Sequence, residues 1–362
     1  MTAPDFDVVI VGGGPAGSAA ALALLKRGAS VAIIERKAVA EDRMGESLAG
    51  VGLEILRELG VMDALQNLEM RPSYLHRASW GGVMEERPAI RSRFGPDLHV
   101  DRREFDTLLL DQARVRGAWV LRPATVRGVE LARGAALVQI AGPEGTRVLR
   151  ATWVLDATGP SASVLRRLGG ARHRVDRLVG FADHHALGQT EPSTLVEAAD
   201  HGWWYSAPRP GGRMVSMFLT DADSPARHAA QAQVWQRCLE SAPLTLARIR
   251  ASRAEGEVRS YLAGPGISHW DTRLPVLPIG DAALSFDPIA ADGICFALRS
   301  GIEAAAVCCA GNAGAAAAFG RGAQRVFDAH LARRESIYAA ERARRTSPFW
   351  QRDRRTGRSL AA

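Results

Sequence analysis

A glycine-rich turn after a short apolar segment near the N-terminus constrains the fold more than any other part of the chain. Residues 8–11 are apolar and β-branched, and Gly12-Gly13-Gly14-Pro15-Ala16-Gly17 follows at once. Residues 15–27 have a helical pattern rich in alanine and leucine, and residues 30–34 form a second apolar segment. A strand, a glycine turn, a helix and a parallel strand make up the βαβ unit of dinucleotide-binding folds.

Each glycine of this turn has a physical task. Gly12 makes the tight turn, Gly14 lets the backbone approach a pyrophosphate, and Gly17 lets the helix pack closely on the strand. The helix N-terminus offers amide donors to the phosphates, and Glu35 ends the second strand where a carboxylate can accept a ribose hydroxyl. The residues predicted to line the nucleotide are Gly12, Gly14, Pro15, Ala16, Gly17, Glu35 and Arg36.

Two further motifs specify the dinucleotide. Asp156-Ala157-Thr158-Gly159 follows an apolar segment in mid-chain, and Gly280-Asp281 lies in the last quarter, before Asp287-Pro288 and Asp292-Gly293. Three such motifs in this order predict FAD. The Asp281 carboxylate can accept hydrogen bonds from ribityl hydroxyls, and helix amides at Gly293 would stabilise the negative charge of a reduced flavin. The other predicted cofactor residues are Ser47, Arg102, Val126, Gly159, Asp281, Pro288, Gly293 and Ile294.

The predicted fold class is α/β, with a Rossmann-like FAD-binding domain of the glutathione reductase type and an inserted β-sheet-rich substrate domain. A chain of 362 residues suits two joined domains. We expect a discontinuous FAD-binding domain over 1–75, 100–171 and 272–345, a substrate domain over 76–99 and 172–271, and a basic, solvated C-terminal tail over 346–362.

Several elements are expected from periodicity and turn residues. Helical patterns cover 51–70, 105–116 with Asp101 as N-cap, 224–251, 292–310 and 321–345. A small β-meander is expected over 119–150, and a hairpin pairs 202–208 with 213–220.

Composition narrows the function. The net charge is +7, but the arginines are scattered, and of 46 basic residues only Lys26 and Lys37 are lysines. We therefore attribute the charge to coding bias and expect no nucleic-acid partner. Four cysteines show neither zinc spacing nor a disulfide framework, so we expect no metal. No signal peptide or membrane-spanning segment is predicted, and a cytoplasmic location is expected.

These motifs together resemble the two-domain FAD-dependent monooxygenases of the para-hydroxybenzoate hydroxylase type. Gly45-Glu46-Ser47-Leu48, Asp101-Arg102 with Phe105-Asp106, and Phe349-Trp350 are most similar to the flavin-dependent tryptophan halogenase-like branch. That branch also contains hydroxylases and the flavoproteins that mature tryptophylquinone enzymes. The resemblance covers nearly the whole chain.

The chain departs from true halogenases in three places. Halogenases carry Trp-x-Trp-x-Ile-Pro in a hairpin, whereas this chain has Trp203, Tyr205, Ala207 and Pro208. They use a lysine beyond the Gly-Glu segment, and this chain has no lysine after Lys37. They also place a small polar residue before the flavin-loop glycine, where this chain has Asp292, whose charge would repel a halide. The resemblance therefore implies hydroxylation rather than halogenation.

The roles of several residues stay open at this point. Asp292 either tunes the flavin and handles a proton or caps a helix. Glu46 either faces the flavin and substrate or holds a helix start. Trp80, Trp203 and Tyr205 either wall a substrate pocket or pack in the core. Asp292 and Glu46 are the candidate catalytic residues.

The resemblance implies an FAD-dependent monooxygenase that hydroxylates an electron-rich substrate through a flavin C4a-hydroperoxide. The substrate would be aromatic or indolic, either a small molecule or a peptide with a tryptophan. Electrons would come from NAD(P)H or a flavin reductase, and O2 would be the oxidant. The alternatives are an FAD-dependent dehydrogenase or reductase without oxygen activation, a halogenase, and a non-catalytic flavoprotein maturation factor.

Overall fold

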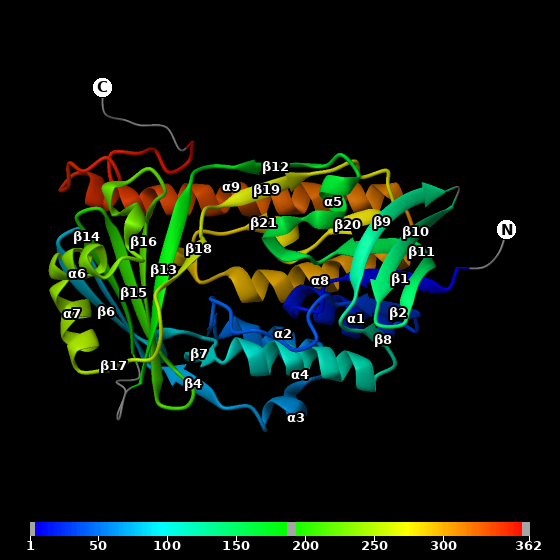
Figure 1. The fold of residues 1–362 in the computed structure, drawn as a ribbon, viewed down its shortest axis with the longest axis horizontal. Coiled ribbons are helices and arrows are strands. Elements are labelled where there is room, and N and C mark those ends of the chain that lie inside the picture. Colours follow the sequence, from blue (N-terminus) through cyan, green and yellow to red (C-terminus); the bar gives the residue numbers. More distant parts are fainter. Residues whose placement is uncertain (1–3, 133, 187–192, 357–362) are drawn as a thin grey trace.

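The computed structural model describes residues 4–132, 134–186 and 193–356. Two large β-sheets lie at opposite ends of an elongated molecule, and helices run between them (Figure 1). The described α-helices are α1 (Pro15–Leu25), α2 (Val51–Glu58), α3 (Met62–Leu65), α4 (Arg102–Val115), α5 (Ser163–Arg167), α6 (Ala232–Glu240), α7 (Pro243–Arg250), α8 (Gly293–Ala310) and α9 (Ala313–Arg342).

The first sheet contains the predicted βαβ unit. β1 pairs in parallel with β2 and with the last part of β11, β2 pairs in parallel with β8, and β20 pairs in parallel with β11. β9 and β10 extend the sheet as an antiparallel meander with the first part of β11. The strands are β1 (Phe6–Val11), β2 (Val31–Ile34), β8 (Trp119–Leu121), β9 (Thr125–Ala132), β10 (Ala135–Gly142), β11 (Gly145–Asp156) and β20 (Val276–Pro278).

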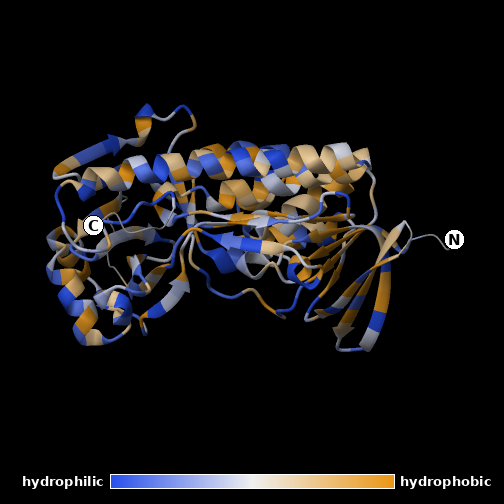
Figure 2. Ribbon diagram, turned by 90° about the horizontal axis from the view of Figure 1, so that it is seen from above, coloured by the Kyte–Doolittle hydropathy of each residue, from blue (hydrophilic) through white to orange (hydrophobic). Residues whose placement is uncertain are grey.

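Helices α1, α4 and α8 cover one face of this sheet and form the main core with it. Figure 2 shows the apolar colouring of these strands and helices, whereas α9 alternates between apolar and polar residues. Among the described helices, α8 alone has the length and apolar composition to cross a membrane, but 56% of it is buried inside the protein, which is usual for a core helix.

The second sheet is largely antiparallel and has the order β17-β13-β16-β15-β14-β5-β6, with β18 also paired to β13. Helices α6 and α7 pack on one face, through a cluster that contains Trp204 and Trp235. The other face turns toward α9 and the first sheet. The strands are β5 (Leu75–Trp80), β6 (Val83–Pro88), β13 (Leu178–Ala186), β14 (Ser193–Ala199), β15 (Gly202–Arg209), β16 (Arg213–Asp221), β17 (Arg253–Ala254) and β18 (Arg259–Leu262).

Two small sheets connect the large ones. One has the order β3-β7-β4 and contacts β15 of the second sheet, and the other has the order β12-β19-β21. Their strands are β3 (Ser47–Leu48), β7 (Asp97–Val100), β4 (Met70–Ser73), β12 (Ala171–Arg174), β19 (Gly266–His269) and β21 (Leu284–Ser285). In addition, α9 runs from the first sheet to the second, as Figure 1 shows.

Most predicted elements are confirmed, including the α/β class, the hairpin β15–β16 and the Asp101 cap of α4. Three predictions were wrong in part. The 51–70 pattern forms two short helices and the strand β4, because Gly60 adopts a left-handed φ of 73°. The 119–150 meander begins at β9, since β8 instead pairs with β2. The last helix begins at Ala313, where Asn312 caps it by accepting a hydrogen bond from the Ala315 amide.

The basic tail is also not a solvated end over the part described. Trp350 is 1% exposed and Arg354 is fully buried. Phe349 and Trp350 pack against Tyr338 of α9, and the Trp350 indole N–H donates to the carbonyl oxygen of Ala199 on β14. Residues 357–362 of the predicted tail lie outside the described range.

Candidate functional site

The three glycine motifs meet at the carboxyl ends of β1, β11 and β20. Gly12 has a φ of 114°, and a Cβ added there would lie 2.3 Å from the carbonyl oxygen of Ala157. A Cβ at Gly17 would lie 2.0 Å from the oxygen of Gly12, and one at Gly280 would lie 2.8 Å from the Cβ of Ala16. Segments that are far apart in the sequence thus pack on one another without room for a side chain, so they form one site.

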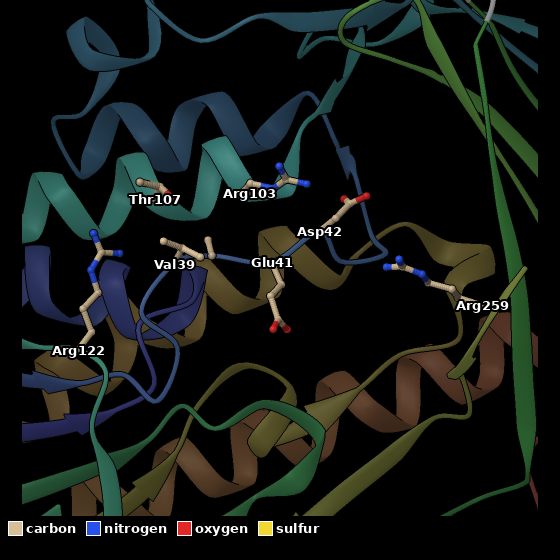
Figure 3. Close-up of a pocket in the computed structure, with 8 residues that line it drawn as sticks. Val39, Glu41, Asp42, Arg103, Thr107, Arg122 and Arg259 are labelled. Carbon is tan, nitrogen blue, oxygen red and sulfur yellow. The ribbon is translucent and has the colours of Figure 1, made fainter. Parts of the chain in front are cut away.

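A groove opens beside this junction (Figure 3). Its larger part has a volume of about 640 Å³, and a smaller cavity adjoins it and shares part of its lining. In Figure 3, Arg122 lies at one end, Arg259 at the other, and Glu41 points into the space between them. A Cβ at Gly14 would meet no atom within 4 Å, so this glycine faces open space. The larger part is lined by Val39, Ala40, Glu41, Asp42, Arg103, Thr107, Arg122 and Arg259.

The Glu35 carboxylate is held against the glycine turn. Its two oxygens accept hydrogen bonds of 2.8 Å from the amides of Gly13 and Lys37. It lines the smaller cavity, at the end where the sequence places the ribose. Arg36 is exposed, and Val126 is buried on β9.

Arg102 holds a loop and an adjacent carboxylate. Its Nε and Nη2 donate to the Asp106 carboxylate, and its Nη1 donates to the carbonyl oxygens of Met44 and Gly45 at 3.1 Å. Its donors therefore fix the loop that leads to Glu46. Ser47 follows on β3 and pairs with β7.

The Gly280-Asp281 turn is held by an arginine that sequence analysis missed. Arg172 on β12 donates from Nη1 to the carbonyl oxygen of Asp281 at 2.8 Å and from Nη2 to the Ser285 hydroxyl at 2.9 Å. Burial raises the pKa of the Asp281 carboxyl, and the charges of Arg102 and Arg172 oppose this rise. Among so many scattered arginines, no sequence signal distinguishes Arg172.

The loop between β21 and α8, residues 286–292, is tied to α9 by ionic and neutral hydrogen bonds; we call it the flavin loop. Asp287 Oδ2 accepts from Arg334 Nε at 2.6 Å and from the Tyr338 hydroxyl at 3.0 Å. Asp287 Oδ1 accepts from the Ile289 amide. Pro288 continues this turn, and Gly293 and Ile294 begin α8.

Asp292 lies at the end of the flavin loop, directly before α8. Its side chain makes no capping hydrogen bond, so the structure does not support the capping alternative. The carboxylate is partly exposed and lies 3.6 Å from Arg333 Nη1. Burial raises its pKa, and Arg333 opposes the rise.

The aromatic residues of the hairpin divide between the two faces of the second sheet. Trp204 packs on α6, whereas Trp203 and Tyr205 face α9 and the flavin loop. Trp203 is fully buried and donates its indole N–H to the Tyr338 hydroxyl at 2.7 Å, an arrangement that favours core packing. Trp80 packs edge-on against Trp203 and donates to the carbonyl oxygen of Ile337.

Tyr205 and Glu46 lie together at the seam between the two sheets. Glu46 is 3% exposed and accepts a hydrogen bond from its neighbouring Gly45 amide at 3.2 Å. Burial raises the pKa of the Tyr205 phenol, and the nearby Glu46 carboxylate raises it further. His99 on β7, which sequence analysis missed, is also fully buried beside Glu46. The apolar residues Leu98 and Val100 on either side of it are the sequence signal that could have predicted its burial.

These features fit an FAD molecule. The junction offers a glycine cradle and the N-terminus of α1, the groove provides room, and Glu35 and Asp281 provide acceptors for hydroxyl groups. Within the described ranges, no group of three or more His, Cys, Asp or Glu side chains is arranged to hold a metal ion.

Comparisons with known proteins agree with this geometry. The family model described as an FAD binding domain matches residues 5–307. LodB of Marinomonas mediterranea, described as an FAD-dependent oxidoreductase, is 26% identical over 357 residues, which is 96% of each chain. The crystal structure of CmlS, a flavin-dependent halogenase, superposes with a TM-score of 0.87 at 25% identity and covers 98% of this chain and 68% of that one.

A solved structure of a hydroxylating enzyme also superposes on the whole chain. The peptidyl tryptophan dihydroxylase QhpG has a TM-score of 0.75 at 23% identity, and the match covers 100% of this chain and 80% of that one. This likeness concerns the fold. The match to the family model, which spans most of the chain, shows that the protein belongs to the FAD-binding-domain family of FAD-dependent oxidoreductases.

Proposed function

We propose that the protein is an FAD-dependent monooxygenase that hydroxylates an electron-rich aromatic substrate. When bound, the flavin supplies two electrons to dioxygen. One oxygen atom then enters a C–H bond of the substrate, and the other leaves as water after taking up two protons. The electron source is NAD(P)H or a separate flavin reductase.

One observation carries this proposal. An aromatic wall of Trp80 and Tyr205, both partly buried and packed on the fully buried Trp203, stands next to the flavin loop, and its polar end is a carboxylate, Glu46, instead of a lysine. Both lysines of the chain are engaged elsewhere: Lys26 donates to the carbonyl oxygen of Glu58, and Lys37 pairs with Glu41. The group that halogenases use to carry the oxidised halide therefore has no counterpart at this wall.

The charge of Asp292 supports the same conclusion. This carboxylate lies where the sequence resemblance places the halide of a halogenase, and like charges at short range repel. We assign it a role beside the flavin, where it holds or moves a proton. The division into an FAD-binding unit (1–75, 100–171, 272–345) and a substrate unit (76–99, 172–271) belongs to this proposal.

The test is product analysis with isotopic oxygen. The FAD-loaded protein is reduced with a flavin reductase and NADH, supplied with ¹⁸O₂ and with phenol or indole, and its products are read by mass spectrometry in buffer that contains bromide. A hydroxylated product with one ¹⁸O atom is expected. A brominated product would instead make the protein a halogenase, and flavin reoxidation without any organic product would make it a reductase or oxidase.

A further inference from the structure

Two buried polar side chains and one buried phenol hydroxyl lie where the small sheet β3-β7-β4 contacts β15. Glu46 directly precedes β3, His99 lies on β7 opposite Ser47, and Tyr205 lies on β15. We call Glu46, His99 and Tyr205 the seam cluster. The backbone joins Glu46 to the residue that follows His99, because the Val100 amide donates to the carbonyl oxygen of Glu46 at 2.9 Å.

The seam cluster is short of hydrogen-bond partners. Within the described residues, neither ring nitrogen of His99 has a hydrogen-bond partner, and the Tyr205 hydroxyl lies beside Glu46 without a hydrogen bond of ordinary geometry. Buried polar groups are almost always paired in native proteins, since an unpaired one costs about 1–3 kcal/mol. Because His99 and Tyr205 both lie near Glu46, we read these two unpaired groups as a place for a polar occupant.

The charged groups around the cluster are engaged with other partners. Asp97 lies 3.4 Å from His76 Nε2, and Arg248 donates to Ser206 and to the carbonyl oxygen of Ser193. The cations on the other packed elements are also held. Arg209 binds Asp42 and contacts His184, while Arg102 binds Asp106. Of the polar groups at this seam, those of the seam cluster are therefore the ones left to bind a ligand.

The chemistry of the cluster defines that ligand. Burial lowers the pKa of His99 to about 4, so its neutral ring offers one donor and one acceptor at pH 7. Glu46 offers an acceptor, and its charge would repel an anion. An aromatic wall continues from Tyr205 to Trp80, and the flavin-loop residue Ile289 packs on the same apolar cluster. A neutral aromatic ring that carries an O–H or N–H donor would match both the polar seam cluster and the aromatic wall.

We propose that the seam cluster is the polar end of the substrate site and recognises an aromatic ring with a ring-bound hydrogen-bond donor, either a phenol O–H or an indole N–H. Glu46 accepts the hydrogen bond from this donor, and His99 and Tyr205 bind the same substituent. The inference rests on the proposed function, because it takes this wall as the substrate side of the flavin. His99 is then a specificity-determining residue.

The experiment compares donors with their methylated counterparts. Oxidised, FAD-loaded protein is titrated with phenol, anisole, indole and 1-methylindole, and binding is followed by flavin absorbance and by calorimetry. One hydrogen bond to a charged group changes affinity by about 10-fold or more. We expect phenol over anisole, indole over 1-methylindole, or both, to show this preference. Which pair shows it identifies the donor class.

Variants test the individual residues. Glu46→Gln and His99→Phe should each reduce the preference to less than about 3-fold, and the control His269→Phe, at an exposed histidine on β19, should retain it. Equal affinity of wild-type protein for both members of each pair, or no binding of any probe, would overturn the inference even if the variants fail to fold. Donor-selective binding without ¹⁸O incorporation would leave it standing and refute the monooxygenase instead.

Discussion

Replacing Arg334 with methionine should destabilise the protein far more than any surface arginine substitution. The Arg334 side chain is fully buried, and it donates from Nε to Asp287 and from Nη2 to Asp176, both at 2.6 Å. Its Nη1 donates to the carbonyl oxygen of Arg354 at 2.7 Å. Removing one partner of a buried ion pair leaves an uncompensated charge, which costs about 3–5 kcal/mol. We expect a loss of that size in the free energy of unfolding.

The adjacent residue provides a matched control. The Arg333 side chain is 61% exposed and lies 3.6 Å from Asp292, so Arg333→Met should change stability by about 1 kcal/mol or less. Urea unfolding of both variants, followed by far-UV circular dichroism, measures the difference. Because Asp287 begins the turn of the flavin loop, Arg334→Met should also retain less FAD on purification. Equal stability of the two variants would refute the assignment of these buried ion pairs.

Other substitutions test the remaining features. Gly17→Ala places a Cβ 2.0 Å from a backbone oxygen and should abolish FAD retention. The control Gly256→Ala has open space around its Cβ and should retain FAD. Flavin absorbance of the purified proteins measures the bound FAD. Trp350→Ala empties a buried aromatic site and should cost about 3–5 kcal/mol in urea unfolding. The folded-state pKa of His99, about 4, lies below the unfolded value near 6.5, so the unfolded state binds more protons between these values. The free energy of unfolding should therefore fall by about 3 kcal/mol as the pH drops from 6.5 to 4. Urea titrations across this range should show a smaller fall for His99→Phe. The same pH dependence in the variant and the wild-type protein would contradict a buried neutral histidine.

The cofactor half of the site could be predicted from the sequence because its determinants are local. A glycine with a φ of 114°, such as Gly12, must occupy a tight turn, and the strand and helix beside it have strong patterns. The three motifs each sit where a strand ends, and parallel strands end at one edge of a sheet. Their meeting point therefore followed from secondary structure alone.

The rest of the site depends on contacts between distant segments. The tail was predicted to be a solvated basic end because charge and composition do not show which residues an arginine will contact. In the structure, Arg354 binds Asp176 and Asp221 in the interior. Arg172 and His99 are similar cases. Each acts through a segment more than 50 residues away, and a single sequence contains no periodicity that reports such a contact.

The cofactor loop and the aromatic wall are held by one chain of hydrogen bonds through α9. The Tyr338 hydroxyl donates to Asp287 in the flavin loop and accepts from the indole N–H of Trp203 on β15. Tyr205 lies two residues further along the same strand and on the same face. Because both hydrogen bonds are buried, the wall has little freedom to move relative to the loop. Under the proposed function, such fixed geometry would hold one ring position of the substrate in place, since a displacement of about 1 Å can cost two orders of magnitude in rate.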